Sequence, residues 1–499
     1  MAVLRYPSSP RGLMRVLHVT PEYYPLIKTG GLADVSGALP PALAGLGGDV
    51  RLLLPGYPAV LDGLDGKTTV KVLTGLPGAA EAKLEFGRTP DGVPAYALNA
   101  PALYHRAGNP YLDAAGNDWP DNHLRFAALG WVAAEFADHW LGDPWRPDVL
   151  HGHDWQSGLM PAYVALNKNA HINRPATVMT IHNIAYQGQF SPAILDAVKL
   201  PKHCFQIEGV EYYGAVGFLK AGLYYADRLT TVSPSYAREI QTEEHGCGLD
   251  GLLAHRTDHL SGILNGVDYQ IWNPATDNHL PARYDANSLA GKAVNKAALQ
   301  AEFGLEPRPD APLFTLITRL NWHKGVDMVL EALPTLIARG GQLVVLGSGD
   351  KGLEEGFRRL AAAHPYEVGV RIGYDEALAH RIQGGADVIM VPSRAEPCGL
   401  TQLYGLRYGT LPLVRRTGGL EDTVIDATPA ALADGCATGF SFGEAETPAL
   451  VWAIRRAIDV YRTKSRWQTM QRTAMTRDFG WTSSARAYME LYQSLKPGR

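Results

Sequence analysis

The chain has 499 residues, of which 46% are hydrophobic and 19% charged, a globular composition that excludes a wholly disordered protein. At roughly 100–200 residues per domain, this length predicts two to four domains with sizeable cores. The 46 Lys and Arg residues oppose 50 Asp and Glu residues, and the net charge of −4 argues against a general nucleic-acid-binding protein.

Neither a membrane protein nor a disulfide scaffold is predicted. No apolar run approaches the roughly 18 residues of a membrane span, and the four cysteines form no CxxC pair. Reduced thiols and a cytoplasmic location are therefore expected. Residues 1–13 lack the apolar core of a signal peptide. Met14 is an alternative start, and we expect residues 1–13 to be a disordered leader.

Short apolar runs recur along the chain, and helical patterns lie between them. In chain order, the predicted strands are 15–19, 50–54, 149–150, 178–181, 228–232, 313–317, 343–346, 368–372, 388–391 and 411–414. Helical patterns include 325–339, 352–363 and 483–495. Continuous apolar strands that alternate with helices predict parallel sheets covered on both faces. The predicted class is α/β with doubly wound sheets.

The chain is expected to divide into two similar halves. Residues 262–312 are rich in turn signals, from GILNGVD to PRPDAP. One internal echo supports the division, because TGGLAD at 29–34 matches TGGLED at 417–422, and each would open a helix. We predict domains at 14–262 and 263–480, followed by a final helix within 481–499.

Residues 28–34, KTGGLAD, are a candidate anion site. Two glycines at a helix start let a ligand approach the backbone N–H groups, the helix dipole favours an anion there, and Lys28 adds a positive charge. A tight strand-to-helix turn explains the same residues equally well. Neither a Walker loop nor a complete GxGxxG fingerprint is present.

His151 and His153, in HGHDW, would face the same side of a strand, as a metal-binding pair does. The sequence shows no third or fourth ligand, so we expect hydrogen bonding at the edge of a cleft and no metal. His182 and Asn183 follow the next predicted strand and could reach the same cleft.

Two further candidates follow predicted strands in the second half. Arg319 and Lys324 lie beyond strand 313–317, where two cations suit a diphosphate, although a solvated basic loop has the same pattern. Glu396 follows strand 388–391 and precedes Pro397, which favours an extended turn. Its carboxylate could accept hydrogen bonds from sugar hydroxyls, or it could simply complement the dipole of a helix that begins within residues 398–401.

Together, seven segments resemble bacterial glycogen synthases and plastid starch synthases over nearly the whole chain from Met14. They are KTGGLADV, HGHDW, TIHNIAYQG, TVSPSY, ILNGVD, RLNWHKG and SRAEPCGLTQLYGLRYGTLPLVRRTGGLEDTV. The resemblance implies a GT-B fold, in which two Rossmann-like domains face a deep cleft and the last helix returns to the first domain. It also implies retaining transfer of glucose from ADP-glucose to the non-reducing end of an α-1,4-glucan such as glycogen, with release of ADP and no metal or organic cofactor.

The resemblance assigns roles to residues that match its motifs. As catalytic residues it implies Lys28, His182, Arg319, Lys324 and Glu396. As donor-binding residues it implies Lys28, Gly30, Gly31, Asp34, Asp154, Asn183, Asn265, Arg319, Lys324, Tyr374, Glu396, Cys398, Gly399, Leu400, Thr401, Gly418 and Gly419.

The implied roles differ among these residues. Lys28 and its glycines would meet the donor diphosphate, and Arg319 with Lys324 would neutralise the leaving phosphate. Glu396 would hold the glucose 3- and 4-hydroxyls, and the backbone carbonyl of His182 would lie near the anomeric carbon. In addition, Tyr374 would stack on adenine, and the amides of Gly418 and Gly419 would face the cleft.

Three other functions stay open at this stage. A transferase of the same fold could use UDP-glucose or another acceptor. A non-catalytic glucan-binding relative would be expected to lose part of the charged set, yet Lys28, Arg319, Lys324 and Glu396 are all present. A glucan phosphorylase would need a pyridoxal phosphate lysine and a longer chain. The departures from the family pattern, Gly152 and residues 321–323, involve none of the assigned charges.

Overall fold

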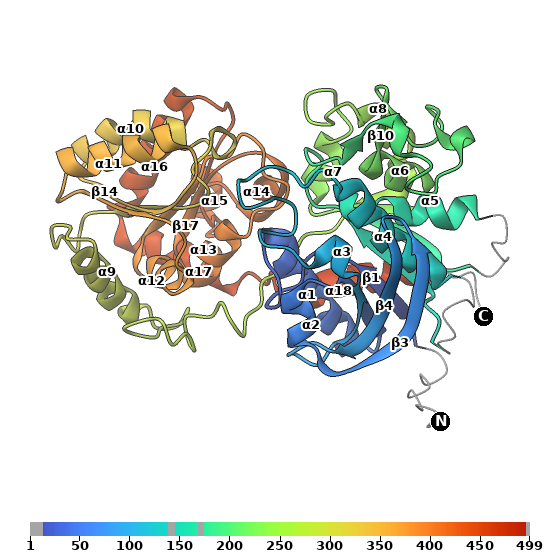
Figure 1. Cartoon of the computed structure of the whole chain (residues 1–499). Helices are drawn as coiled ribbons and strands as arrows, with labels where there is room; N and C mark the ends of the chain where they lie inside the picture. Colours follow the sequence, from blue (N-terminus) through green and yellow to red (C-terminus); the bar gives the residue numbers. More distant parts are fainter. Residues whose placement is uncertain (1–12, 138–144, 168–173, 496–499) are drawn as a thin grey trace. The chain divides into compact units, whose positions relative to one another are not determined.

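The computed structural model describes residues 13–137, 145–167 and 174–495, so the predicted leader, except Leu13, lies outside the described residues. The chain forms two compact units (Figure 1). The first contains the chain up to Val232, Ala237–Gly266 and the chain from Trp481 onward, and the second contains Ser233–Tyr236 and Val267–Gly480. Each unit has one large sheet with parallel strands at its centre, which confirms the predicted α/β class.

The first unit is built on a nine-stranded sheet in the order β12-β11-β7-β6-β1-β2-β5-β4-β3. Its strands are β1 (Arg15–Val19), β2 (Asp49–Pro55), β3 (Asp65–Leu76), β4 (Ala79–Arg88), β5 (Pro94–Asn99), β6 (Val149–His153), β7 (Ala176–Ile181), β11 (Arg228–Thr231) and β12 (Leu260–Gly262). The strands from β12 to β5 are parallel, and the β3–β4 hairpin extends the sheet in the antiparallel sense. A separate small antiparallel sheet contains β8 (Gln189–Phe190), β9 (Glu211–Tyr212) and β10 (Ala215–Gly217).

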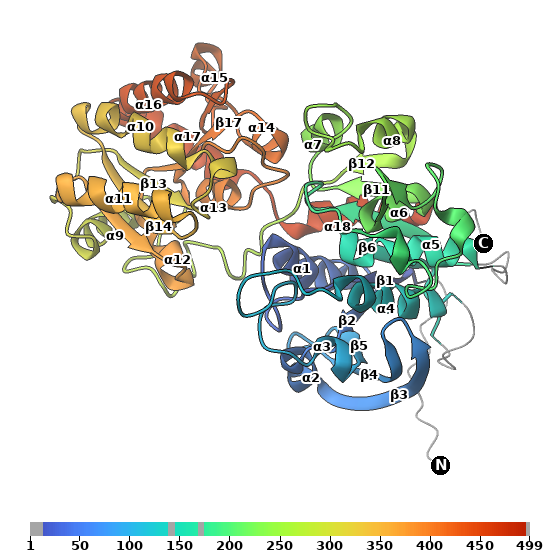
Figure 2. The same ribbon diagram turned by 45° about the horizontal axis from the view of Figure 1, so that its top comes forward.

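Helices of the first unit pack on this sheet, and the last helix of the chain is one of them. The helices are α1 (Gly31–Gly45), α2 (Pro58–Gly63), α3 (Pro101–Tyr104), α4 (Asn122–Glu135), α5 (Leu159–Leu166), α6 (Phe218–Tyr225), α8 (Asp250–His255) and α18 (Trp481–Ser494). A further helix, α7 (Pro234–Glu239), is divided between the two units at Tyr236. Figure 2 shows α18 beside α1, and Tyr488 and Tyr492 share one apolar cluster with Val35 and Leu39. Helix α18 therefore belongs to the core of the first unit.

The second unit has a six-stranded parallel sheet in the order β15-β14-β13-β16-β17-β18. Its strands are β13 (Leu313–Ile317), β14 (Gln342–Gly347), β15 (Val368–Ile372), β16 (Val388–Val391), β17 (Leu411–Arg415) and β18 (Phe440–Phe442). Its helices are α9 (Ala290–Glu302), α10 (Val326–Ala338), α11 (Lys351–Ala363), α12 (Glu376–Gly385), α13 (Thr401–Tyr408), α14 (Gly418–Thr423), α15 (Pro429–Ala433), α16 (Thr447–Tyr461) and α17 (Lys464–Thr476). Helices α10, α11 and α16 cover one face of the sheet, and α9, α12, α13 and α17 cover the other (Figure 1).

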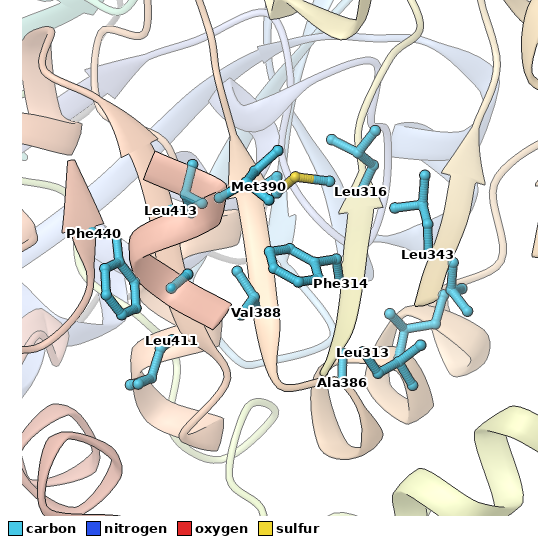
Figure 3. Close-up of a cluster of buried hydrophobic side chains, with 14 of the residues drawn as sticks. Leu313, Phe314, Leu316, Leu343, Ala386, Val388, Met390, Leu411, Leu413 and Phe440 are labelled. Atoms are coloured by element: carbon cyan, nitrogen blue, oxygen red, sulfur yellow. The ribbon is translucent and has the colours of Figure 1, made fainter. Parts of the chain in front are cut away.

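The core of the second unit fixes its two central strands. Phe314 of β13 lies opposite Val388 of β16 in the strand register, and both are fully buried (Figure 3). Each such side chain contributes roughly 1.5–3 kcal/mol by leaving water. The loops that follow β13 and β16 therefore start from rigid supports.

The strand order reverses at one point in the parallel part of each sheet, and these two points are where ligands are expected. In the first sheet the reversal lies between β1 and β6, and in the second it lies between β13 and β16. Loops leave the carboxyl ends of such a strand pair in opposite directions and open a crevice between them. Among the described residues, no helix combines the length and apolar character needed to cross a bilayer.

Candidate functional site

The reversal point of the second sheet brings two predicted site residues together. Lys324 ends the short 3₁₀ turn Trp322–Lys324 after β13, and Glu396 follows β16. The Lys324 ammonium Nζ lies 2.6 Å from Glu396 Oε2, and Ser393 Oγ donates to the same oxygen at 2.8 Å. The other oxygen, Glu396 Oε1, accepts no hydrogen bond from the part of the chain that the structure describes. This carboxylate is buried and is held so that one oxygen is left for a ligand.

Arg319 supplies a second positive charge at the same strand end. It lies two residues beyond β13 and is exposed. Within the described ranges, its guanidinium forms no ion pair or side-chain hydrogen bond. A guanidinium can bind two phosphate oxygens at once, and here it needs no internal bond broken first.

The start of α13 offers further donors next to Glu396. Gln402 Nε2 donates to the carbonyl oxygens of Cys398 and Gly399, both at 2.9 Å, and so fixes the turn before the helix. The backbone N–H groups of Gly399, Leu400 and Thr401 donate no hydrogen bond within the described residues. Such amides at a helix start favour an anion.

The second glycine pair differs from its predicted role. The N–H of Gly419 donates to the carbonyl oxygens of Glu396 (3.2 Å) and Pro397 (3.0 Å), so it is already used inside the protein. A Cβ atom on Gly418 would lie 2.1 Å from the Glu396 carbonyl oxygen, and one on Gly419 would lie 2.2 Å from that of Cys398. The pair therefore lets α14 pack directly on the Glu396 loop. The Gly419 amide, which was predicted to face a ligand in the cleft, supports this loop instead.

We expect Gly418→Ala to lower the free energy of unfolding of the second unit by more than the cost of placing alanine in the left-handed backbone region. Gly418 has φ +46°, and its new methyl group would also collide with the Glu396 carbonyl. Gly435→Ala is the matched control, because Gly435 has φ +68° and its nearest neighbour would be 3.7 Å away. The control should lose about 1–2 kcal/mol, and Gly418→Ala clearly more, in urea unfolding. Equal losses would contradict the close packing.

Two other predicted residues could contact a ligand, Tyr374 because its side chain is exposed and Asn265 because its amide oxygen has no hydrogen-bond partner among the described residues. Tyr374 follows β15, and the residue is 68% exposed. Asn265 lies three residues after β12, and its buried Oδ1 has no hydrogen-bond partner among the described residues. An unsatisfied buried amide oxygen costs free energy unless a ligand or water pairs with it.

The glycine loop of the first unit, residues 28–34, is organised by Glu22, which belongs to none of the predicted motifs. Glu22, three residues after β1, accepts hydrogen bonds from the backbone N–H groups of Thr29 and Gly30 and from the hydroxyl of Tyr111. Burial raises the pKa of Glu22, and these hydrogen bonds oppose the rise. The Gly30 amide, predicted to meet a diphosphate, is thus occupied by Glu22, whereas the Gly31 amide makes no bond within the described residues.

The rest of this loop lies open. Lys28 Nζ pairs with Asp34 Oδ1 at 2.7 Å, and both side chains are partly exposed. A Cβ atom on Gly30 or Gly31 would meet nothing within 4 Å. The two TGGL segments therefore have different surroundings. The space beside Gly30 and Gly31 is open to a ligand, whereas neighbouring backbone occupies the space beside Gly418 and Gly419.

Asp154, at the end of β6, holds the residues after β7. Its Oδ1 accepts the backbone N–H groups of His182 (2.7 Å) and Asn183 (3.4 Å), so three predicted site residues lie together. Its backbone has φ 54° and ψ −172°, a combination that costs non-glycine residues roughly 1–3 kcal/mol. Burial raises the pKa of Asp154 to about 7. Backbone strain and a buried carboxyl in one residue are typical of a functional site.

We expect Asp154→Asn to stabilise the protein progressively as the pH rises. Because the pKa of Asp154 is raised in the folded state, the folded carboxyl keeps its proton at pH values where the unfolded chain has lost it. The folded protein therefore loses stability as the pH rises from about 4 to 7. The neutral amide avoids this loss, and its advantage should reach a few kcal/mol above pH 7. The check is the difference in unfolding midpoint across pH 4–8. Asp196→Asn, an exposed control, should show no such trend.

A group of buried histidines lies behind Asp154. His18, His151 and His153 each offer a ring nitrogen, and these atoms lie within 4.8 Å of one another. His151 already bonds the Tyr492 hydroxyl (2.7 Å) and Thr180 Oγ1 (2.6 Å) through its two nitrogens. A metal ion would have to replace such bonds among buried side chains, so the arrangement favours a hydrogen-bonded network. The third histidine, His18, comes from β1, and only the strand register reveals it.

Comparisons with known proteins agree with the fold of two α/β units described above. Residues 15–255 match the starch synthase catalytic domain family, and residues 300–473 match the glycosyl transferases group 1 family. The chain is 53% identical over 484 residues to the glycogen synthase of Paramagnetospirillum magneticum, covering 97% of this chain and 98% of that protein. It is 52% identical to the glycogen synthase of Albidiferax ferrireducens, over 97% of this chain and all of that protein.

A solved structure of similar fold is the catalytic domain of starch synthase IV from Arabidopsis thaliana bound to ADP and acarbose. It has a TM-score of 0.87 and 32% identity, covering 97% of this chain and 99% of that one. Sucrose-phosphate synthase from Thermosynechococcus elongatus shares the fold alone, with a TM-score of 0.57 and 17% identity over 97% of this chain and 99% of that one. From these matches, the chain belongs to the bacterial glycogen synthases, hexosyltransferases of the starch and glycogen synthase type with the two-domain GT-B fold.

Proposed function

We propose that this glycogen synthase takes glucose from ADP-glucose and adds it to the non-reducing end of an α-1,4-glucan, with release of ADP and retention of the anomeric configuration. The observation that carries the proposal is the charge arrangement at the reversal point of the second sheet. Lys324 there pairs with Glu396, and Arg319 has no internal partner among the described residues. Arg319 and Lys324 would bind a diphosphate, and the remaining oxygen of Glu396 would bind a sugar hydroxyl.

The two cations suit the leaving group. Cleavage of the bond between glucose and phosphate adds negative charge to the diphosphate oxygen, and Arg319 and Lys324 would stabilise that charge more in the transition state than in the ground state. The free amides of Gly399, Leu400 and Thr401 would add to this stabilisation. ADP is then a good leaving group, and a strong general acid is less necessary than in a glycosidase.

Residues of the first unit would serve the sugar and the rest of the donor. Lys28 and the Gly31 amide would contribute to diphosphate binding, with Asp34 as the partner that Lys28 has before a ligand arrives. The backbone carbonyl of His182 would face positive charge at the anomeric carbon, and Asp154 holds that backbone in place. Asn183 and Asn265 would complete the polar contacts, and Tyr374 of the second unit would stack on adenine.

We propose attack on the same face as the departing phosphate, because each of the three buried carboxyl groups described at the site is already held by donors of the protein. Glu396 pairs with Lys324, Asp154 accepts two backbone N–H groups, and Glu22 accepts two backbone N–H groups and a hydroxyl. Trapping a covalent glucosyl–enzyme intermediate on a side chain would contradict this route.

Domain roles and location complete the proposal. We assign the acceptor side to residues 14–262, the donor side to residues 263–480, and no metal or organic cofactor to either. The starch synthase IV structure bound to ADP and acarbose supports a nucleotide and a glucan as ligands of this fold. The four free cysteines support a reducing, cytoplasmic setting.

The test is ADP release from ADP-glucose with and without glycogen. We expect glycogen-dependent release together with lengthening of the glucan chains. UDP-glucose at the same concentration is the matched comparison, and faster turnover with UDP-glucose would overturn the assignment of the donor. Hydrolysis of ADP-glucose that is indifferent to glycogen would overturn the assignment of the acceptor.

A further inference from the structure

Four histidines lie near the carboxyl ends of three neighbouring strands in the first unit. His18 on β1 is opposite His151 on β6 in the strand register, and His153 is two residues further along β6 on the same face. His182 follows β7, the next strand in the sheet. The ring centroids of neighbouring members lie 4.3–5.2 Å apart.

Three of these rings form a chain of nitrogen-to-nitrogen hydrogen bonds. His18 Nδ1 lies 2.9 Å from His153 Nε2, and His153 Nδ1 lies 3.0 Å from His182 Nε2. Burial lowers the pKa of His18 and of His182 to about 3, and that of His153 well below its usual range, so all three rings are neutral. A neutral imidazole has one N–H and one bare nitrogen. The position of one proton therefore fixes the position of the other two.

The buried end of the chain decides between its two proton arrangements. His18 Nε2 is buried and has no hydrogen-bond partner among the described residues. A buried N–H without an acceptor is the rarer defect in proteins, so the bare nitrogen belongs at this position. The His18 proton is then on Nδ1 and is donated to His153 Nε2. His153 in turn donates from Nδ1 to His182 Nε2, which leaves the His182 proton on Nδ1.

We propose that His18 and His153 are positioning residues for His182, whose ring they hold in one orientation with its proton on Nδ1. The Nδ1–H group makes no hydrogen bond within the described residues, and it would be available to an oxygen atom of the substrate. This inference rests on the proposed function, in which His182 lies beside the donor sugar. Asp154 fixes the backbone of His182, and the histidine chain fixes its side chain.

The variants His153→Leu and His153→Asn separate positioning from packing. An asparagine amide can occupy the place of Nδ1 and donate to His182 Nε2, whereas leucine cannot donate. We expect His153→Leu to lower kcat by about 10- to 100-fold with little change in the donor KM, because a misplaced group near the reacting atoms costs this much. His153→Asn should recover most of the loss.

The decisive measurement is the tautomer of His182, from ¹⁵N NMR of the imidazole nitrogens in histidine-labelled free enzyme. Its signals are assigned by their loss in His182→Gln. We expect a protonated Nδ1 and a bare Nε2 in the wild type, and a mixture of tautomers in His153→Leu.

Two results would overturn the proposal: a proton on Nε2 in the wild type, or a His153→Leu variant in which either the tautomer or kcat is unchanged. An inactive wild type would instead refute the proposed function. The tautomer of the free enzyme would still test this inference on its own.

Discussion

Loss of both cations after β13 is expected to abolish most of the activity. In the double variant Arg319→Met, Lys324→Met, kcat should fall by at least about 1,000-fold, since one group that stabilises developing charge typically contributes roughly 100- to 1,000-fold. Methionine keeps most of the apolar stem of each side chain and removes the charge together with its N–H donors. Turnover at saturating ADP-glucose gives kcat, and calorimetric titration with ADP should show weaker binding as well.

The two single variants should differ in stability. Arg319 makes no internal ion pair within the described residues, so its removal should leave the unfolding midpoint nearly unchanged. Lys324 pairs with a buried carboxylate at 2.6 Å, and Lys324→Met should lower the midpoint because this carboxylate then loses its ion-pair partner.

The control for net charge is Arg359→Met, Arg466→Met. Arg359 lies on α11 and Arg466 on α17 of the same unit, and both residues are exposed and form no ion pair within the described residues. This variant has the same total charge as the test variant and should retain wild-type kcat. A test variant with kcat within tenfold of wild type would contradict the role of Arg319 and Lys324.

Much of the central architecture was predictable because its strands are short, continuous apolar runs. The predicted bounds 15–19, 313–317, 368–372 and 388–391 coincide with β1, β13, β15 and β16. A strand buried on both faces has few alternatives in water, so its composition alone identifies it. The prediction that each TGGL segment opens a helix is likewise confirmed, by α1 and α14.

The β3–β4 hairpin was missed because its sequence lacks this signal. Most residues of β3 are exposed, and polar residues such as Lys67 and Thr69 interrupt the apolar ones. An edge strand needs only one partly buried face, so its composition approaches that of a loop. Long-range pairing with β4, and not local preference, makes it a strand.

The unpredicted parts of the site depend on tertiary contacts. Glu22 belongs to no sequence motif, and its role appears only when the chain returns to place Thr29 and Gly30 beside it. His18 meets His153 only through the register of β1 and β6. The two TGGL segments are identical in sequence, yet one is open and the other is packed against backbone. Sequence thus identified charged residues at strand ends, but not which atoms are already occupied.

Glu396→Gln is the substitution that best separates catalysis from nucleotide binding. The amide has nearly the same shape as the carboxylate but cannot offer a charged acceptor to the sugar hydroxyls. Two charge-assisted hydrogen bonds, each worth about 1.5–3 kcal/mol, total about 3–6 kcal/mol, so kcat should fall by at least about 100-fold. The Kd for ADP, which carries no glucose, should stay within about fivefold of wild type.

The direction of the small change in ADP affinity is itself informative. In the wild type, Lys324 pairs with Glu396 at 2.6 Å, and in the proposed reaction it would be shared between Glu396 and the incoming diphosphate. Without the negative charge on residue 396, the ammonium is free for phosphate, so ADP should bind equally well or more tightly. Ser393→Ala is the control, because it removes one hydrogen bond to the same oxygen and leaves the charge intact. Its kcat should fall by less than about tenfold. If Glu396→Gln weakened ADP binding in step with turnover, Glu396 would act on the nucleotide and not on the sugar.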